Sequence, residues 1–153
     1  MSTKRIAFEK TVPSTPIISL SALKDSQIIE IEFKDLDYIN SSGVRNLIKW
    51  LKDLEAAYPM LIMRVEKVPP ILVRQLLSIK DYLPKKLEVT SVYVPYFCDG
   101  CNSEDHSLLV NSESVRNAAS PKEALTESVL CKTCGQKMEP DAVLDKYLGI
   151  MLK

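Results

Sequence analysis

The chain has 153 residues, of which 46% are hydrophobic and 26% are charged, and its 20 basic residues balance its 20 acidic residues. This is the composition of an ordinary soluble globular protein, and a net charge of zero excludes a strong overall attraction to nucleic acid or anionic lipid. No apolar run reaches the roughly 18 residues that a membrane span needs, and the amino terminus is too polar for a signal peptide. We therefore expect a soluble cytoplasmic protein that has no contact with a membrane.

Hydrophobic periodicity predicts the elements of the first half of the chain. Weak alternation predicts an edge strand over residues 4–12, while the segment 13–26 is compatible with either a strand or one or two helical turns. Residues 27–36 alternate apolar and charged side chains, which predicts a half-buried strand. From residue 42 to Pro59, apolar residues recur at helical spacing opposite a charged face. This pattern predicts an amphipathic helix that the proline ends.

The second half continues the alternation of strands and helices. Residues 61–65 predict a short strand, residues 69–84 begin and end with proline and predict a helix, and residues 87–97 predict another strand. Residues 138–153 predict a closing helix. Its apolar stripe consists of Val143, Tyr147 and Met151, bordered by Leu144 and Leu148. Strands that alternate with helices predict an α/β fold in which helices cover a sheet.

Four cysteines form two C-x-x-C pairs in the second half of the chain. They are Cys98, Cys101, Cys131 and Cys134. Without a secretion signal, such pairs indicate metal ligands before they indicate disulfides. Zinc takes four thiolates in a tetrahedron, and each C-x-x-C turn supplies two of them. We therefore expect one structural zinc ion in a zinc-ribbon module, with a redox dithiol pair, two disulfides or an iron–sulfur cluster as alternatives.

The residues around the cysteines support this expectation. Gly100, Asn102 and Gly135 lie at or beside the two turns, where a chain that wraps a metal needs unusual backbone angles. Four thiolates leave no open coordination position, so the zinc would be structural and not catalytic. We expect His106, the only histidine, to be a polar loop residue.

The charge between the two cysteine pairs disfavours nucleic acid as a partner. From Asp99 to Glu139 there are four basic and seven acidic residues, and no aromatic residue lies between Cys101 and Cys131. Phosphate contacts need Lys and Arg, and base stacking needs aromatic rings. We therefore expect the ribbon to be structural or protein-binding. A nucleic-acid-binding zinc ribbon with an accessory α/β domain remains the alternative.

A second conspicuous stretch is YINSSGVRNL, residues 38–47, at the expected strand-to-helix corner. Asn and Ser are preferred helix N-caps because a side-chain oxygen satisfies a free backbone N–H, so the corner needs no function beyond capping. Trp50 falls at the edge of the apolar stripe of the following helix. We expect it to be partly buried core, with a docking surface as the other possibility.

The longer stretch IIEIEFKDLDYINSSGVRNLIKWLKDL, residues 28–54, resembles the STAS domain family of bacterial anti-sigma-factor antagonists. In that family an apolar strand leads into a D-S-S-G-(L/V)-like motif that opens a helix. The resemblance continues through residues 61–84 and covers roughly residues 4–97. It departs from the family in Asn40, where an aspartate is usual, and in a first helix that is shortened or absent between residues 12 and 27.

The resemblance implies a STAS-like mixed β-sheet with helices packed on it. It also implies that the serine directly before the glycine, Ser42, is phosphorylated by a partner kinase that acts as an anti-sigma factor, with Ser41 as the second choice. A phosphate adds nearly two negative charges, and a helix start can hold that anion. Partner-binding candidates are Asn40, Ser41, Gly43 and Trp50.

These observations predict three parts: a STAS-like α/β domain over residues 1–97, a zinc-ribbon insertion over 98–138, and a C-terminal helix over 139–153 that packs back on the α/β domain. The sequence has no G-x-S-x-G, H-E-x-x-H or glycine-rich phosphate loop, and only four glycines. We therefore expect no enzyme. The predicted function is that of a regulatory domain that binds a protein partner, with phosphorylation at Ser42 as a switch.

Overall fold

The computed structural model describes residues 2–11, 19–38 and 40–152, and for residues 9–11 and 34–38 it describes the backbone alone. Four parallel strands form the first sheet, in the order β1-β2-β3-β4. They are β1 (Thr3–Thr11), β2 (Ile28–Tyr38), β3 (Ile62–Glu66) and β4 (Leu87–Val89). The predicted edge strand is confirmed as β1, and the α/β class is confirmed with it.

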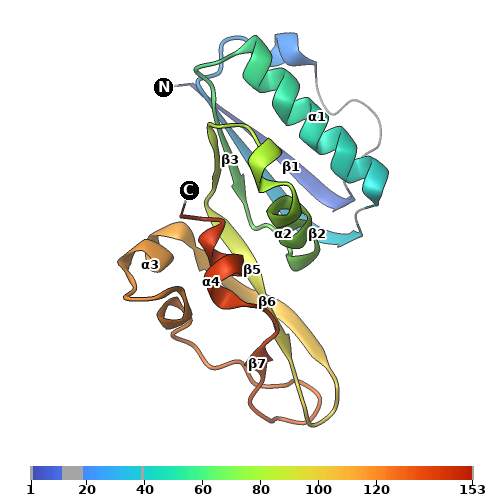
Figure 1. Cartoon of the computed structure of the whole chain (residues 1–153). Helices are drawn as coiled ribbons and strands as arrows, with labels where there is room; N and C mark the ends of the chain where they lie inside the picture. Colours follow the sequence, from blue (N-terminus) through green and yellow to red (C-terminus); the bar gives the residue numbers. More distant parts are fainter. Residues whose placement is uncertain (1, 12–18, 39, 153) are drawn as a thin grey trace.

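Helices follow the strands in the predicted order. They are α1 (Ser41–Ala57) between β2 and β3, and α2 (Pro70–Ser78) with the short 3₁₀ helix η2 (Lys80–Tyr82) between β3 and β4. Because the strand order never reverses, right-handed crossovers place both helices on the same face of the sheet, as Figure 1 shows. Between β1 and β2 the described residues hold only η1 (Leu20–Leu23), and residues 12–18 of the ambiguous segment lie outside the described part of the chain.

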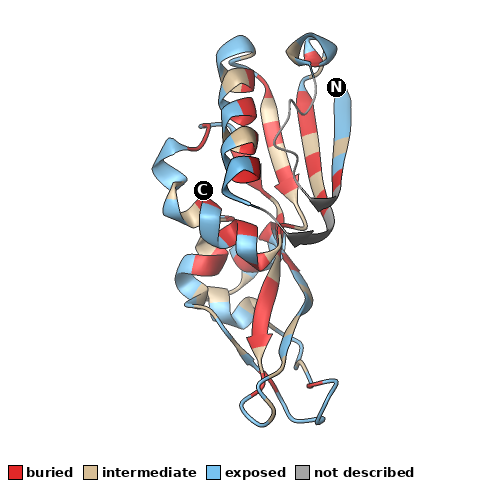
Figure 2. Cartoon of the chain, turned by 90° about the vertical axis from the view of Figure 1, so that its right-hand side faces the viewer, coloured by how far each residue is buried: buried red, intermediate tan, exposed pale blue. Residues whose placement is uncertain are grey.

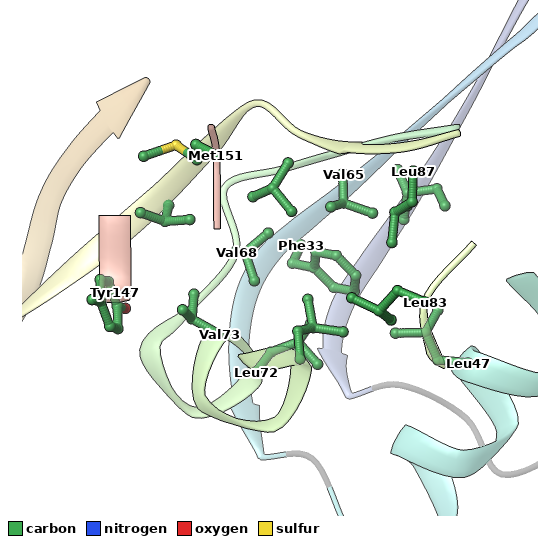
Figure 3. Close-up of a cluster of buried hydrophobic side chains, with 14 of the residues drawn as sticks. Phe33, Leu47, Val65, Val68, Leu72, Val73, Leu83, Leu87, Tyr147 and Met151 are labelled. Atoms are coloured by element: carbon green, nitrogen blue, oxygen red, sulfur yellow. The ribbon is translucent and has the colours of Figure 1, made fainter. Parts of the chain in front are cut away.

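The core lies between the parallel sheet and these two helices. β2 contributes Ile29, Ile31 and Phe33, which alternate with charged residues as predicted and are all buried. They meet the buried apolar stripe of α1, which includes Leu47, and residues of α2 such as Leu72 (Figure 3). The prediction that the amphipathic pattern of residues 42–58 marks a core-facing helix is confirmed.

The opposite face of the parallel sheet is charged. The strand register sets Arg5, Glu30, Arg64 and Glu88 side by side across the four strands. Arg5 pairs with Glu30 at 3.2 Å, and Arg64 pairs with Glu88 at 3.0 Å. Parallel sheets are usually covered by helices on both faces. Here a ladder of alternating charges keeps this face compatible with water.

A second, antiparallel sheet follows. Its strands, in the order β6-β5-β7, are β5 (Ser91–Phe97), β6 (Glu104–Asn111) and β7 (Glu139–Pro140). Thr90 alone separates β4 from β5, so the single strand predicted over residues 87–97 is wrong and consists of two strands in two sheets. The expectation of one mixed sheet is also wrong, since the structure has a parallel sheet and a separate antiparallel sheet.

The two sheets are joined at the carboxyl end of β3. Val68 pairs with Val92 in an isolated parallel bridge, and the N–H of Val68 donates to the carbonyl of Ser91 at 3.1 Å. Along the chain, β5 ends at residue 97, and β6 and β7 of the same antiparallel sheet come after it. The domain boundary expected between residues 97 and 98 therefore falls inside a sheet.

The chain closes with α3 (Ser112–Asn117), η3 (Pro121–Ala124) and α4 (Leu144–Gly149). Tyr147 and Met151 are buried as predicted, but Val143 is 69% exposed, because it is the N-cap residue before α4 and does not share its buried side. The Tyr147 hydroxyl donates to the carbonyl of Tyr93 at 2.6 Å, and α4 lies against α2 and η3. These contacts hold the closing helix against α2, η3 and β5, and its buried residues belong to one continuous hydrophobic core.

No helix in the described part of the chain combines the length and the apolar character that a bilayer crossing requires.

Candidate functional site

The first cysteine pair lies on the hairpin between β5 and β6. Phe97 pairs with Glu104 across this hairpin. Inside it, the N–H of Cys98 donates to the carbonyl of Ser103 at 2.9 Å, and the N–H of Asn102 donates to the carbonyl of Cys98 at 2.8 Å. Asn102 has a φ of 59°, a left-handed conformation that asparagine tolerates better than most residues. The backbone thus turns tightly around the two sulfurs.

The second cysteine pair repeats this geometry. Leu130 bridges Lys137, the N–H of Cys131 donates to the carbonyl of Gln136 at 2.8 Å, and the N–H of Gly135 donates to the carbonyl of Cys131 at 2.9 Å. Gly135 has a φ of 77° and occupies the same place in its hairpin as Asn102 in the first. The two C-x-x-C segments are therefore two copies of one local structure. We call them the metal hairpins, residues 97–104 and 130–137.

The metal hairpins bring all four sulfurs together. The four Sγ atoms lie within 4.8 Å of one another, and Cys98–Cys134 and Cys101–Cys131 are each separated by 3.4 Å. A disulfide needs about 2.05 Å, so all four cysteines are free thiols. Four thiolates around one zinc ion, at about 2.3 Å from it, would be about 3.8 Å apart. The cluster could hold a single metal ion, as the spacing of the cysteines predicted.

Backbone N–H groups point at the sulfurs. Hydrogen bonds from the N–H groups of Cys134 and Thr133 lower the pKa of Cys131 to about 6. The N–H of Gln136 lowers the pKa of Cys134, but the hydrogen bond shared with Cys98, burial and the other thiols outweigh it and raise the value to about 12. A metal ion replaces the protons that the thiols would otherwise share, so the N–H groups stabilise bound thiolates.

Side chains around the sulfurs tie the two hairpins to each other. Ser103 Oγ lies 3.0 Å from Cys101 Sγ and donates to Thr133 Oγ1 at 3.3 Å. A Cβ at Gly100 would lie 2.2 Å from Oε1 of Gln136, on the other hairpin, so the flexible Gln136 side chain would have to move aside to accept it. No sequence pattern indicates these contacts beyond their closeness to the cysteines, because they depend on how the hairpins face each other.

Charged side chains lie beside the cysteine cluster. Lys132 lies 3.9 Å from the Asp105 carboxylate across the hairpins. Burial raises the pKa of Asp105, but hydrogen bonds from Ser107 and the charge of Lys132 outweigh it and hold the pKa below its usual value. His106 is exposed on β6, 4.0 Å from Glu104, and does not belong to the cysteine cluster. Its expected place in a loop is wrong, since β6 includes it.

The residues at the strand-to-helix corner, 40–43, which we call the serine corner, lie at the start of α1, far from the metal hairpins (Figure 1). Asn40 is the N-cap: its Oδ1 accepts from the N–H of Gly43 at 2.6 Å, and its carbonyl accepts from the N–H of Val44 at 3.0 Å. Ser41 and Ser42 are therefore the first two residues of the helix and not its cap. Both are exposed, as Figure 2 shows for this end of α1.

The other partner-binding candidates divide between surface and core. Asn40 is exposed, whereas Gly43 is buried and Trp50 is only 7% exposed, within the core cluster. Arg45, which the sequence did not single out, reaches back over the first turn of α1. Its Nε donates to the carbonyl of Ser41 at 3.4 Å, which places a guanidinium beside the two serines.

Comparison with known proteins adds no identification: no family model, no curated protein and no solved structure matches this chain.

Proposed function

We propose that this protein is a non-enzymatic regulatory module that binds a protein partner through the region of α1, and that one structural zinc ion stabilises its second sheet. The observation that carries the proposal is the exposure of Ser41 and Ser42 at the start of a 17-residue helix. The helix is anchored in the core through residues that include Leu47 and Leu51. A change at the serines would therefore alter the surface that a partner meets and leave the fold intact.

Zinc is the metal that best suits the cysteine cluster. The donor set is four thiolates, two of them buried, on two preformed turns with backbone N–H groups directed at the sulfurs. Soft thiolates favour zinc or iron over magnesium or calcium, and four of them around one zinc ion are typical of structural sites. A multinuclear iron–sulfur cluster would need more space than sulfurs within 4.8 Å of one another provide.

Ser42 is the proposed phosphoacceptor, in line with the STAS resemblance. Its Oγ would attack the γ-phosphorus of ATP bound to a partner kinase. The bond to the bridging oxygen breaks, ADP leaves, and the hydroxyl proton passes to a base of the kinase. The phosphate then lies at a helix N-terminus, where backbone N–H groups and the helix dipole favour an anion. Arg45, already over this turn, adds a charge-assisted partner.

The exposed side of α1 indicates the chemistry of that partner. Arg45, Lys49 and Lys52 are all exposed and follow one another at helical spacing. Of the two acidic residues on the helix, Asp53 pairs with Lys49 at 2.8 Å, and Glu55 accepts from the backbone N–H of Lys85 at 2.6 Å. The remaining positive charge suits an acidic protein surface. A phosphate on Ser42 would reverse the charge at one end of this row and weaken such a contact.

The test uses the full chain with zinc bound as bait in bacterial lysate. We expect it to retain a kinase-like ATPase, and expect Ser42→Asp to lose that protein while Ser42→Ala keeps it. Lys52→Glu should weaken retention, whereas Lys122→Glu, an exposed charge reversal on η3, should leave it unchanged. Equal retention by all four variants would refute α1 as the docking surface. Retention of DNA in place of a protein would refute the choice of partner.

A further inference from the structure

The close sulfur contacts of the cysteine cluster run between the metal hairpins. Cys98 and Cys134 are 3.4 Å apart, and so are Cys101 and Cys131. Each of these contacts joins a cysteine of the first hairpin to one of the second. A movement of between 1 and 2 Å, about the difference between this distance and a disulfide bond, would therefore connect the hairpins covalently.

The four cysteine residues differ in how exposed they are to solvent. Cys98 and Cys131 are 0% and 3% exposed, Cys101 is half-buried, and Cys134 is exposed. Two backbone N–H groups donate to Cys131, from Thr133 and Cys134, while one donates to Cys134, from Gln136. When all four sulfurs are thiolates bound to a metal ion, a hydrogen bond that lowers the basicity of a sulfur also makes it a weaker nucleophile. Cys134 thus combines the greatest access with less of this protection than Cys131 has.

We propose that Cys134 is an oxidation site for small hydroperoxides and that Cys98 resolves it, so that oxidation replaces the metal ion by a disulfide between the two hairpins. The proposal rests on the metal centre of the proposed function and is independent of Ser42. Redox-sensitive cysteines are accessible and often lie beside a second cysteine, and a bound metal ion holds its cysteine ligands as thiolates. Cys98 fits the role of the second cysteine, because it is closed to solvent and 3.4 Å from Cys134.

The chemistry is a two-electron oxidation in two steps. The Cys134 thiolate attacks one oxygen of hydrogen peroxide, the O–O bond breaks, and the leaving oxygen takes a proton and departs as water. The product is a sulfenic acid. The Cys98 thiolate then attacks the Cys134 sulfur, the S–O bond breaks, and hydroxide leaves and takes up a proton to form a second water. Two thiolates and two protons are consumed for each peroxide, and two electrons pass from sulfur to oxygen.

The metal ion leaves as a consequence. Two of its four ligands are then bonded to each other, and the remaining pair, Cys101 and Cys131, is too few to hold zinc tightly. The new bond closes the chain between residues 98 and 134, so the hairpins stay joined after the ion has gone. Oxidation would therefore change the metal content and the surface of this end of the molecule without releasing β7 and α4 from the rest.

The test is mass spectrometry of the wild-type, zinc-loaded chain treated with up to one equivalent of hydrogen peroxide. A chelating dye follows zinc release, and peptides mapped without reduction identify the disulfides. We expect zinc release to rise in step with a peptide that links Cys98 to Cys134. A sulfenic-acid trap added with the peroxide should label Cys134 before any other cysteine. Disulfides within a hairpin, first labelling of Cys131 or Cys98, or a failure to bind zinc would each overturn the proposal.

Two matched variants provide a second measurement. Histidine can replace one thiolate in a structural zinc site. Cys134→His and Cys101→His are therefore each loaded with zinc, and their metal content is measured. We expect peroxide to release zinc from Cys134→His about tenfold more slowly than from wild type, because the accessible thiolate is gone. Cys101→His keeps Cys134 and Cys98 and should stay close to wild type. Equal rates in the two variants would contradict the assignment to Cys134.

Discussion

Asn40 and Gly43 are linked by a hydrogen bond of 2.6 Å, in which the backbone N–H of Gly43 donates to the side-chain oxygen of Asn40. This bond makes Asn40 the cap of α1 and leaves the two serines between them inside the first turn, at the surface. Because a different residue does the capping, a substitution at either serine is separable from the stability of the helix. This separation allows the corner to be tested without unfolding it.

Asn40→Ala should lower the free energy of unfolding by about 1 kcal/mol, since the N–H of Gly43 loses its partner. Asn40→Asp, which keeps a capping oxygen, should stay near wild type. Ser41→Ala and Ser42→Ala should each change stability by less than about 0.5 kcal/mol. Urea unfolding followed by circular dichroism measures these values. A serine variant as destabilised as Asn40→Ala would show that the serines help to cap the helix.

Trp50→Ala should cost about 3–5 kcal/mol, the usual penalty for removing a large buried aromatic side chain. The reason is that Trp50 is 7% exposed and belongs to the core cluster. Lys49→Ala, one residue away and exposed, is the matched control and should be nearly neutral. Chemical denaturation, followed by the fluorescence of the single tryptophan, measures the stability of the control variant. Weakened partner binding by Trp50→Ala with unchanged stability would instead make Trp50 a docking residue.

Tyr147→Phe should destabilise the protein by about 1 kcal/mol, because the carbonyl of Tyr93 loses the hydroxyl that donates to it. Val143→Ala, at an exposed position next to the same helix, should have little effect. Thermal unfolding by calorimetry compares the two. If Tyr147→Phe were neutral, the contact between α4 and β5 would contribute packing alone.

The same tyrosine should make stability fall at alkaline pH. Burial raises the pKa of Tyr147 far above its usual value, and burial together with Glu139 raises the pKa of Tyr96. In the unfolded chain both titrate near pH 10, so their contribution is complete below about pH 10 and is lost as the pH rises toward the folded values. Tyr147→Phe should show a shallower loss between about pH 9 and pH 11, measured by urea unfolding. An unchanged slope would contradict the buried, neutral state of Tyr147.

Cys131→Ser should abolish stoichiometric metal binding, because it removes a buried ligand from a four-thiolate set. Elemental analysis should find about one zinc per wild-type chain and much less in the variant. A strong chelator should lower the melting temperature of the wild type and leave that of Cys131→Ser unchanged. Ser103→Ala, beside Cys101 but not a ligand, is the control and should keep its metal. Wild-type chains without metal but with disulfides would refute the zinc proposal.

The parallel sheet and its helices were predictable because their apolar residues repeat at a regular spacing. The strand predicted over residues 27–36 became Ile28–Tyr38, and the helix predicted over residues 42–58 became Ser41–Ala57. In both, one side must face a core, so apolar residues repeat at a fixed spacing. The meeting of the four sulfurs was equally predictable, since each C-x-x-C turn is a local structure.

The antiparallel sheet was not predictable in the same way. β6 is mostly exposed, and its sequence EDHSLLVN has no apolar alternation to detect. The change of sheet at Thr90 was hidden because residues 87–97 are apolar on both sides of it. Which strand β5 pairs with depends on residues far along the chain, and no short-range pattern records that choice.

The near-identity of the two metal hairpins has a consequence for how this architecture can vary. Each hairpin closes through its own backbone bonds, so residues 97–104 and 130–137 fix the sulfurs without help from the segment that connects them. Doubling the length of a connecting loop costs only about 0.6 kcal/mol. Insertions between the end of α3 and the start of η3, at residues 118–120, would therefore leave the ligands in register. That span is where the chain could accept new sequence while the cysteine cluster stays assembled.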